Sequence, residues 1–368
     1  MRMPAFFLSA ALLAAASAAQ AQPGCDGYPV PCVRDVAIAY PATGHMSGDM
    51  RGSTHELTFN RKDGKSLWIT APMYDAIVEV TMDGAMKFHP MPAGSMPHGI
   101  SFDSAGRLYA SLEGAGAVAE IDAATGAIKR RIAVNADPHG LGIGADGKTV
   151  WFTGKSKNTV GRILGDGQAL NFPLPTPDAL PIYIAAGRDG AMWFTELTGN
   201  RIGRVTAGGK ITEFRIPTDD SRPIAIVQDP SAYAMWFSQE AGNKVGRIDA
   251  QGNIIEFDVP KSQANSILAG LAFDAEGNLW VQQYVNQNKP EPEGPDFIIK
   301  IGKSILKARP GDKLDFTFYE VPTRKTVMHR IVQGPDMNMW FTELKADRFG
   351  RVILKVPRHE KNASSSRY

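Results

Sequence analysis

The sequence predicts an all-β protein, a seven-bladed β-propeller whose last blade is completed by an N-terminal strand. Three observations predict this fold: a unit of about 42 residues recurs along the chain, each unit reads as short strands separated by turns, and no stretch keeps a helical period. A period in the low forties is typical of one propeller blade of four strands.

The repeat is clearest in the stretch Pro97 to Glu113, and one of its positions can be followed through the whole chain. Successive copies lie 41 to 45 residues apart, with one longer spacing of 60. The seven copies of this repeat position are His55, His98, His139, Ile182, Ile224, Ala269 and His329. Seven copies predict seven blades.

Each unit contains the strand signals that a blade requires. In the fourth unit, an apolar run from Pro181 is followed by an Asp-Gly turn, an aromatic strand that begins Trp193-Phe194, a third strand that includes Gly203-Arg204, and a fourth from Ile211 to Ile216. Runs of β-branched and aromatic residues bounded by Gly, Asn and Asp are typical of strands and hairpins. Glu196 and Glu343 recur beside Arg204 and Arg351, which suggests that these four residues stabilise blades as partners.

The N-terminus has the three parts of a secretory signal peptide over residues 1–21. Arg2 supplies a charge, Phe6 to Ala19 an apolar core, and Ala19-Gln20-Ala21 a small-residue cleavage site. We therefore expect a secreted or periplasmic protein without a membrane span. Because such compartments are oxidising, Cys25 and Cys32, the only two cysteines, are predicted to form a disulfide within an N-terminal loop at 22–32.

The propeller is predicted as a single domain over residues 33–357, followed by a disordered polar tail at 358–368. Val33 to Ala42 resembles a fourth strand although it precedes the first unit, and the last unit, from His329, has only three recognisable strands. The N-terminal strand is therefore predicted to complete the last blade, which leaves no sheet edge open.

Charge and motifs exclude several classes of function. Lys and Arg total 40 against 38 for Asp and Glu, and no basic stripe interleaves with aromatic residues, so nucleic acid is not an expected partner. The chain has no serine nucleophile elbow, phosphate-binding loop, dinucleotide fingerprint or cysteine-rich metal motif. We expect a monomer that binds a small molecule.

One face of the propeller is predicted to collect the candidate site. The strands of a blade are antiparallel, so the start of the first strand and the end of the second lie on the same face. Four of the seven histidines occupy the repeat position, and Glu113 and Asp137 should lie near them. An alternative interpretation is that these histidines only hydrogen-bond neighbouring blades or water.

Several units, among them Pro-His-Gly-Ile, Trp-Phe-Thr-Glu and Asn-x-Ile-Gly-Arg, resemble those of the streptogramin B lyases, also called the virginiamycin B lyase family. The resemblance is strongest from Pro181 to Thr218. It implies a seven-bladed propeller that inactivates an antibiotic by a magnesium-dependent elimination, which opens a cyclic depsipeptide at its ester bond. In this family one His holds the substrate, a second His is the base, and Glu residues hold the metal.

Two alignments of the family site fit the chain, and each lacks one residue. In the first, His55 holds substrate, His98 is the base and Glu113 binds metal, but Met96 replaces the other carboxylate. In the second, His98 holds substrate, Asp137 binds metal and His139 is the base, but Lys155 replaces the second Glu.

The combined hypothesis places Mg²⁺ on Glu113 and Asp137, since their blades are adjacent. His98 or His139 is then the base, and substrate is held by His55, His98 and His329. Neutral imidazole suits proton abstraction beside a carbonyl near neutral pH, and an oxygen-bound magnesium ion would stabilise the enolate.

Other functions stay open. Met96 and Lys155 favour a non-catalytic exported propeller that binds a ligand or protein on this face, while Glu113 and the sequence Asp137-Pro138-His139 favour a metal-assisted carbon–oxygen lyase. A third alternative is a propeller hydrolase such as a lactonase.

Overall fold

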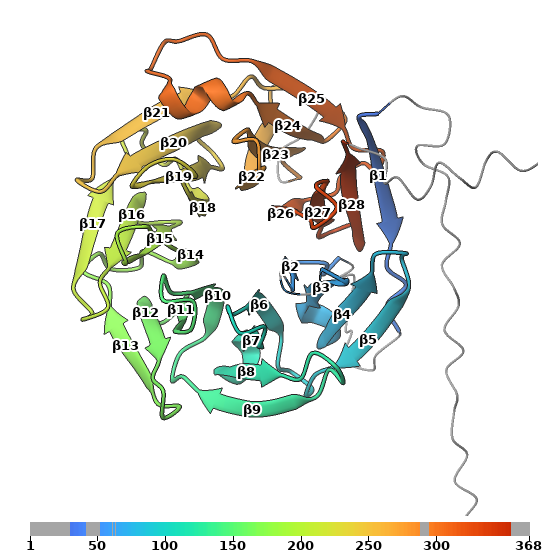
Figure 1. The fold of residues 1–368 in the computed structure, drawn as a ribbon. Helices are drawn as coiled ribbons and strands as arrows, with labels where there is room; N and C mark the ends of the chain where they lie inside the picture. The colour runs from blue at the N-terminus through green and yellow to red at the C-terminus, as the bar shows by residue number, and fades with distance from the viewer. Residues whose placement is uncertain (1–29, 42–51, 61, 63, 288–293, 355–368) are drawn as a thin grey trace, which may run out of the picture.

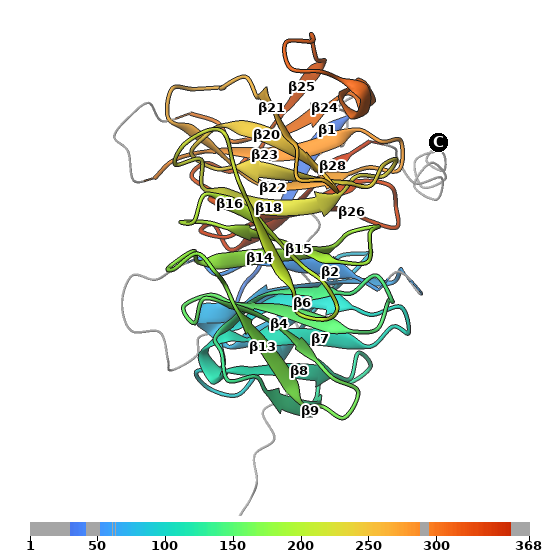
Figure 2. The ribbon, with the colours of Figure 1, turned by 90° about the vertical axis from the view of Figure 1, so that its left-hand side faces the viewer.

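The computed structural model is a closed ring of seven four-stranded antiparallel sheets, as predicted (Figure 1). It describes residues 30–41, 52–60, 62, 64–287 and 294–354. Figure 2 shows the ring from the side, with its blades stacked one above another. No helix in this part of the chain is long and apolar enough to cross a membrane.

The first six blades follow the chain in order. They comprise β2 (Leu57–Phe59), β3 (Ser66–Ala71), β4 (Ala76–Thr81) and β5 (Met86–Pro90); β6 (Pro97–Phe102), β7 (Leu108–Leu112), β8 (Ala117–Ile121) and β9 (Ile128–Ala133); β10 (Pro138–Ile143), β11 (Val150–Gly154), β12 (Thr159–Ile163) and β13 (Ala169–Pro173); β14 (Pro181–Ala186), β15 (Met192–Glu196), β16 (Arg201–Val205) and β17 (Ile211–Arg215); β18 (Pro223–Gln228), β19 (Ala234–Gln239), β20 (Lys244–Asp249) and β21 (Ile254–Asp258); β22 (Ser266–Phe273), β23 (Leu279–Val285), β24 (Phe297–Ile301) and β25 (Phe316–Glu320). Short 3₁₀ turns lie at Pro72–Tyr74, Glu113–Ala115 and Lys303–Lys307.

The seventh blade joins the two ends of the described chain, which confirms the predicted closure. It consists of β26 (Met328–Gln333), β27 (Met339–Glu343), β28 (Arg348–Ile353) and the N-terminal strand β1 (Cys32–Ala37). Strand β1 pairs antiparallel with β28 from Cys32 opposite Ile353 to Ala37 opposite Arg348, and Figure 1 shows them side by side. The predicted signal peptide, Cys25 and the predicted tail lie outside the described residues.

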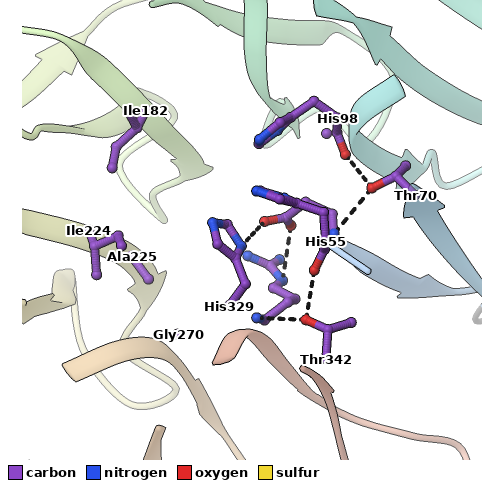
Figure 3. A network of polar contacts seen from close by, with 12 residues as sticks. His55, Thr70, His98, Ile182, Ile224, Ala225, Gly270, His329 and Thr342 are labelled. Carbon is purple, nitrogen blue, oxygen red and sulfur yellow. Dashed lines mark hydrogen bonds and ion pairs between the residues drawn. The ribbon is translucent and has the colours of Figure 1, made fainter. Parts of the chain in front are cut away.

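A recurring hydrogen bond joins neighbouring blades at six of the seven junctions and fixes the register of the repeat position there. A hydroxyl on the second strand of one blade donates to the backbone carbonyl at the repeat position of the following blade. The pairs are Thr342 to His55 (2.6 Å), Thr70 to His98 (2.6 Å), Ser111 to His139 (2.8 Å), Thr153 to Ile182 (3.3 Å), Thr195 to Ile224 (3.0 Å) and Ser238 to Ala269 (2.6 Å). At the seventh junction, from blade six to blade seven, the amide of Gln282 instead donates to the backbone carbonyl of Arg330 at 3.1 Å. Figure 3 shows the repeat positions of blades one, two, four, five and seven gathered around the central channel.

The Gly-Arg signature of the third strands has a packing role. In blade four, Gly203 lies under the ring of Phe194, and a Cβ at that position would lie 2.0 Å from the ring. The guanidinium of Arg204 lies 5.6 Å from the Trp193 ring centre, and its Nε donates to Asp189 Oδ2 at 2.7 Å. The partner of Arg204 is thus this turn aspartate.

The predicted partnership of Glu196 with Arg204, and of Glu343 with Arg351, is therefore wrong. Arg351 likewise contacts the turn residue Asp336, at 3.4 Å. The two glutamates are fully buried at the ends of β15 and β27, where other acidic residues face them.

Candidate functional site

Four histidines form a continuous arc along one side of the channel, as their shared repeat position predicts. The ring centres of His329 and His55 are 3.7 Å apart, those of His55 and His98 3.8 Å, and those of His98 and His139 3.6 Å. Figure 3 shows His55, His98 and His329 pointing into the channel, across from Ile182 and Ile224. Blades seven, one, two and three therefore supply a single imidazole surface.

Burial favours the neutral form of three of these imidazoles, those of His55, His98 and His139. Desolvation lowers the pKa of His55, His98 and His139 well below the ordinary histidine value, and neighbouring histidines together with Lys155 lower it further. His139 Nδ1 lies 3.1 Å from the backbone carbonyl of Ile182. A neutral ring in that contact donates its Nδ1 proton, which leaves a free electron pair on Nε2.

Glu113 lies beside the His98–His139 end of the arc. One oxygen of its carboxylate and one nitrogen of each of His98 and His139 lie within 4.8 Å of one another. Burial raises the pKa of Glu113, and the ammonium of Lys155, whose Nζ lies 3.3 Å from Oε1, partly offsets this. The 3₁₀ turn Glu113–Ala115, which follows β7, brings the carboxylate into this position.

Asp137 lies near Glu113 but makes structural contacts of its own. Its negative charge contributes to the raised pKa of Glu113. Asp137 Oδ2 accepts the backbone N–H of Ser156 at 2.7 Å, and Oδ1 accepts that of Lys157 at 3.2 Å. The backbone N–H of Lys155 donates to the Asp137 carbonyl at 3.3 Å. Asp137 thus holds the loop that carries Lys155.

A second group, which the sequence analysis missed, fills the channel next to His55 and His329. Glu56 Oε1 lies 3.1 Å from His329 Nδ1, and its Oε2 lies 3.5 Å from Arg330 Nε. Burial would raise the pKa of Glu56, but Arg330 and His329 outweigh it and hold the pKa below its ordinary value. The Arg330 guanidinium also lies over the Tyr183 ring, 4.5 Å from its centre.

A signal for this second group was present in the repeat. The position after the repeat position is Gly or Ala in four units, namely Gly99, Gly140, Ala225 and Gly270. In the other three it is Glu56, Tyr183 and Arg330. Large polar side chains at a position that is otherwise small must project into the channel, where these three meet.

The hollow between Glu56, His98, His139 and Tyr183 is little larger than a water molecule. A small-molecule ligand of drug size does not fit inside this hollow. A wider hollow of about 530 Å³ lies at the outer edge of blades five and six, lined among others by Phe257 and Phe316, and contains none of these residues.

Comparisons with known proteins agree with the propeller fold. The family model described as the virginiamycin B lyase family matches residues 49–289, more than half of the chain. The chain belongs to the virginiamycin B lyase family. A virginiamycin B lyase of Nocardia farcinica (strain IFM 10152) is 35% identical over 129 residues, a match that spans 35% of this chain and 44% of that protein.

Solved structures of this family have the same fold. A streptogramin B lyase structure aligns with a TM-score of 0.74 at 23% identity, covering 88% of this chain and 97% of that one. The virginiamycin B lyase of Staphylococcus aureus aligns with a TM-score of 0.68 at 25% identity, covering 87% and 98%. A catalytically inactive variant of the latter, with one histidine replaced by alanine, has been solved with quinupristin.

Proposed function

We propose that this protein is an exported carbon–oxygen lyase that opens a cyclic ester or depsipeptide by removing a proton next to a carbonyl. The observation that carries the proposal is the close pair of neutral imidazoles, His98 and His139, beside Glu113 and Lys155. Membership of the virginiamycin B lyase family supports the lyase activity, and the signal peptide predicted from the sequence of residues 1–21 is the basis for proposing export.

His139 is the better candidate for the base. Its Nδ1 contact with the Ile182 carbonyl directs the free electron pair of Nε2 away from the blade, and its lowered pKa keeps it unprotonated at neutral pH. His98, whose ring centre lies 3.6 Å from that of His139, then contacts the substrate, as in the second alignment of the family site. His55 and His329 extend the same binding surface.

The reaction needs no water. The imidazole takes the proton from the carbon next to the carbonyl, and the electron pair forms a carbon–carbon double bond to the next carbon. The bond from that carbon to the ester oxygen breaks, and the oxygen leaves as part of a carboxylate. The ring opens without a change in total mass, whereas hydrolysis by a lactonase would add one water.

The residues at this site are a poor match for the predicted magnesium ion. Mg²⁺ prefers an octahedral set of oxygen ligands, whereas the group around Glu113 offers one carboxylate and two imidazoles, a set better suited to transition metals. The carboxylate is already paired with Lys155. Magnesium on Glu113 and Asp137 therefore stays a prediction, and no step above depends on it.

The test is incubation of the purified mature protein with quinupristin, followed by mass spectrometry. We expect a ring-opened product of unchanged mass, and about 10²- to 10⁴-fold lower kcat for His139→Ala, because general-base catalysis typically contributes this much. His359→Ala, outside the repeat position, is the control. A product heavier by one water would identify a hydrolase instead.

The second candidate function is a non-catalytic binding propeller. It is favoured by Met96 and Lys155, which stand where the family site has carboxylates. Calorimetric binding of quinupristin without any turnover, together with loss of binding in His98→Ala, would establish it.

A further inference from the structure

Both groups of two histidines and one glutamate on this face are paired with a cation of the protein itself. Lys155 Nζ lies 3.3 Å from Glu113, and Arg330 Nε lies 3.5 Å from Glu56. The two carboxylates are the only ones in the metal-like groups found among the described residues. A fixed positive charge thus occupies the place next to each carboxylate where a metal ion would bind.

The position of Lys155 is built by the fold. Its loop joins β11 to β12, and three backbone N–H groups of that loop, from residues 155 to 157, donate to Asp137. The ammonium meets a Glu113 side chain that is only 16% exposed, while the Lys155 side chain is 33% exposed. One side of the ammonium therefore remains open to a ligand at the mouth of the channel.

We propose that the ammonium of Lys155 supplies the positive charge that stabilises the enolate oxygen, in place of a divalent metal ion. This rests on the lyase function proposed above. The base takes the proton from carbon, the carbonyl oxygen gains negative charge, and Lys155 donates a hydrogen bond to that oxygen without giving up its own proton. The carboxylate of Glu113 forms an ion pair with this ammonium. Asp137 is a positioning residue, because it accepts the backbone hydrogen bonds of the loop that carries Lys155.

A metal ion and the ammonium exclude each other on Glu113. Both need the same partly buried carboxylate, and two cations within a few ångströms in such a site repel strongly. Removing the ammonium and adding a carboxylate at the same position should therefore create a metal site. Lys155→Glu does this, since it places a second carboxylate beside Glu113 and the two imidazoles.

The first experiment measures metal binding and is independent of turnover. Mn²⁺ and Mg²⁺ are titrated calorimetrically into the wild-type protein and the Lys155→Glu variant. We expect saturable Mn²⁺ binding only in the variant, and its loss in the double variant Lys155→Glu/Glu113→Gln. Saturable binding to the wild type that Glu113→Gln abolishes would overturn the proposal and support the predicted magnesium site.

The second experiment measures elimination of quinupristin. We expect wild-type turnover to be unchanged by EDTA and Lys155→Met to lower kcat by about 10²-fold or more, as for loss of one oxyanion donor. Lys148→Met, an exposed lysine on the opposite face of the same blade, is the control and should keep full turnover. Full turnover by Lys155→Met would overturn the proposal. If the wild type turns nothing over, the lyase function fails, and the metal titration alone decides where the cation lies.

Discussion

At the scale of single residues, the last position of the second strand of a blade can be either a glutamate or a glutamine. In blades four, five and seven this position is Glu196, Gln239 and Glu343. Gln239 Nε2 donates to Glu256 at 2.7 Å. Neither Glu196 nor Glu343 receives a hydrogen bond on its carboxyl oxygens from the described residues. The carboxylates that face them, Glu213 and Asp35, can only accept, so a hydrogen bond at these positions needs Glu196 and Glu343 as donors, the role that Gln239 has in blade five.

A protonated carboxyl can make this donation. Burial, with Glu213 opposite, raises the pKa of Glu196 from 4.5 to about 8. Burial, with Asp35 opposite, raises the pKa of Glu343 from 4.5 to about 9. Since the folded pKa exceeds the unfolded one, the stabilisation is fully present below pH 4.5, falls steadily as the pH rises from there, and is lost once the pH has passed the folded values of about 8 and 9.

We predict that Glu196→Gln/Glu343→Gln resists alkaline unfolding better than the wild type. An amide does not ionise, so the variant should keep the stability that the wild type loses, on the order of a few kcal/mol, as the pH rises from 4.5 to about 9. Melting temperatures from pH 5 to pH 10 measure this, and the two proteins should converge toward the acid end. Gln239→Glu is the reverse variant and should increase the loss at high pH. Parallel pH curves would contradict the prediction.

At the scale of elements, the glycine of the third strand allows the aromatic second strand to pack across it. A Cβ would lie 2.2 Å from Phe152 at Gly161, 2.0 Å from Phe194 at Gly203 and 2.2 Å from Phe237 at Gly246. Such contacts are too short for any side chain unless the ring moves. The repeat keeps glycine there because the blade needs the ring in its core.

We predict that Gly203→Ala lowers the free energy of unfolding by about 1–3 kcal/mol through overpacking. Denaturant titration measures the change. Gly165→Ala is the control, because a Cβ there meets nothing within 4 Å. Phe194→Leu should recover part of the loss in the Gly203→Ala background, and a purely additive double variant would show that the ring is not the cause.

The site itself was only partly predictable from the sequence. The repeat position gathers the four histidines because the spacing alone fixes their blades. The contact of Lys155 with Glu113 depends on the shape of two loops, which no periodicity encodes. The pairing of Glu56 with Arg330 joins the first and last blades of the ring and requires its closure, although the large side chains at a small repeat position were a readable sign.

At the scale of the whole molecule, closure decides both stability and the site. The sequence predicted it from a spare strand at one end and a three-stranded unit at the other, and β1 pairs with β28 as expected. Asp35 on β1 ties three segments together, since it accepts hydrogen bonds from Arg348 at 2.8 Å and from the hydroxyl of Thr323 at 2.7 Å. His329 of the last blade meets His55 of the first only because the ring is closed.

We predict that deleting residues 22–41 opens the ring. The edge of β28 loses six paired residues, and the melting temperature should fall by on the order of 10 °C or more, since a loss of several kcal/mol acts on a domain of this size. Deleting residues 358–368, the predicted tail, is the control. Because the N-terminal deletion could prevent folding altogether, Asp35→Ala is a milder variant: it keeps strand β1 but removes the hydrogen bonds from Arg348 and Thr323, and it should lower the melting temperature by less. An unchanged melting curve in both N-terminal variants would show that the last blade does not depend on β1.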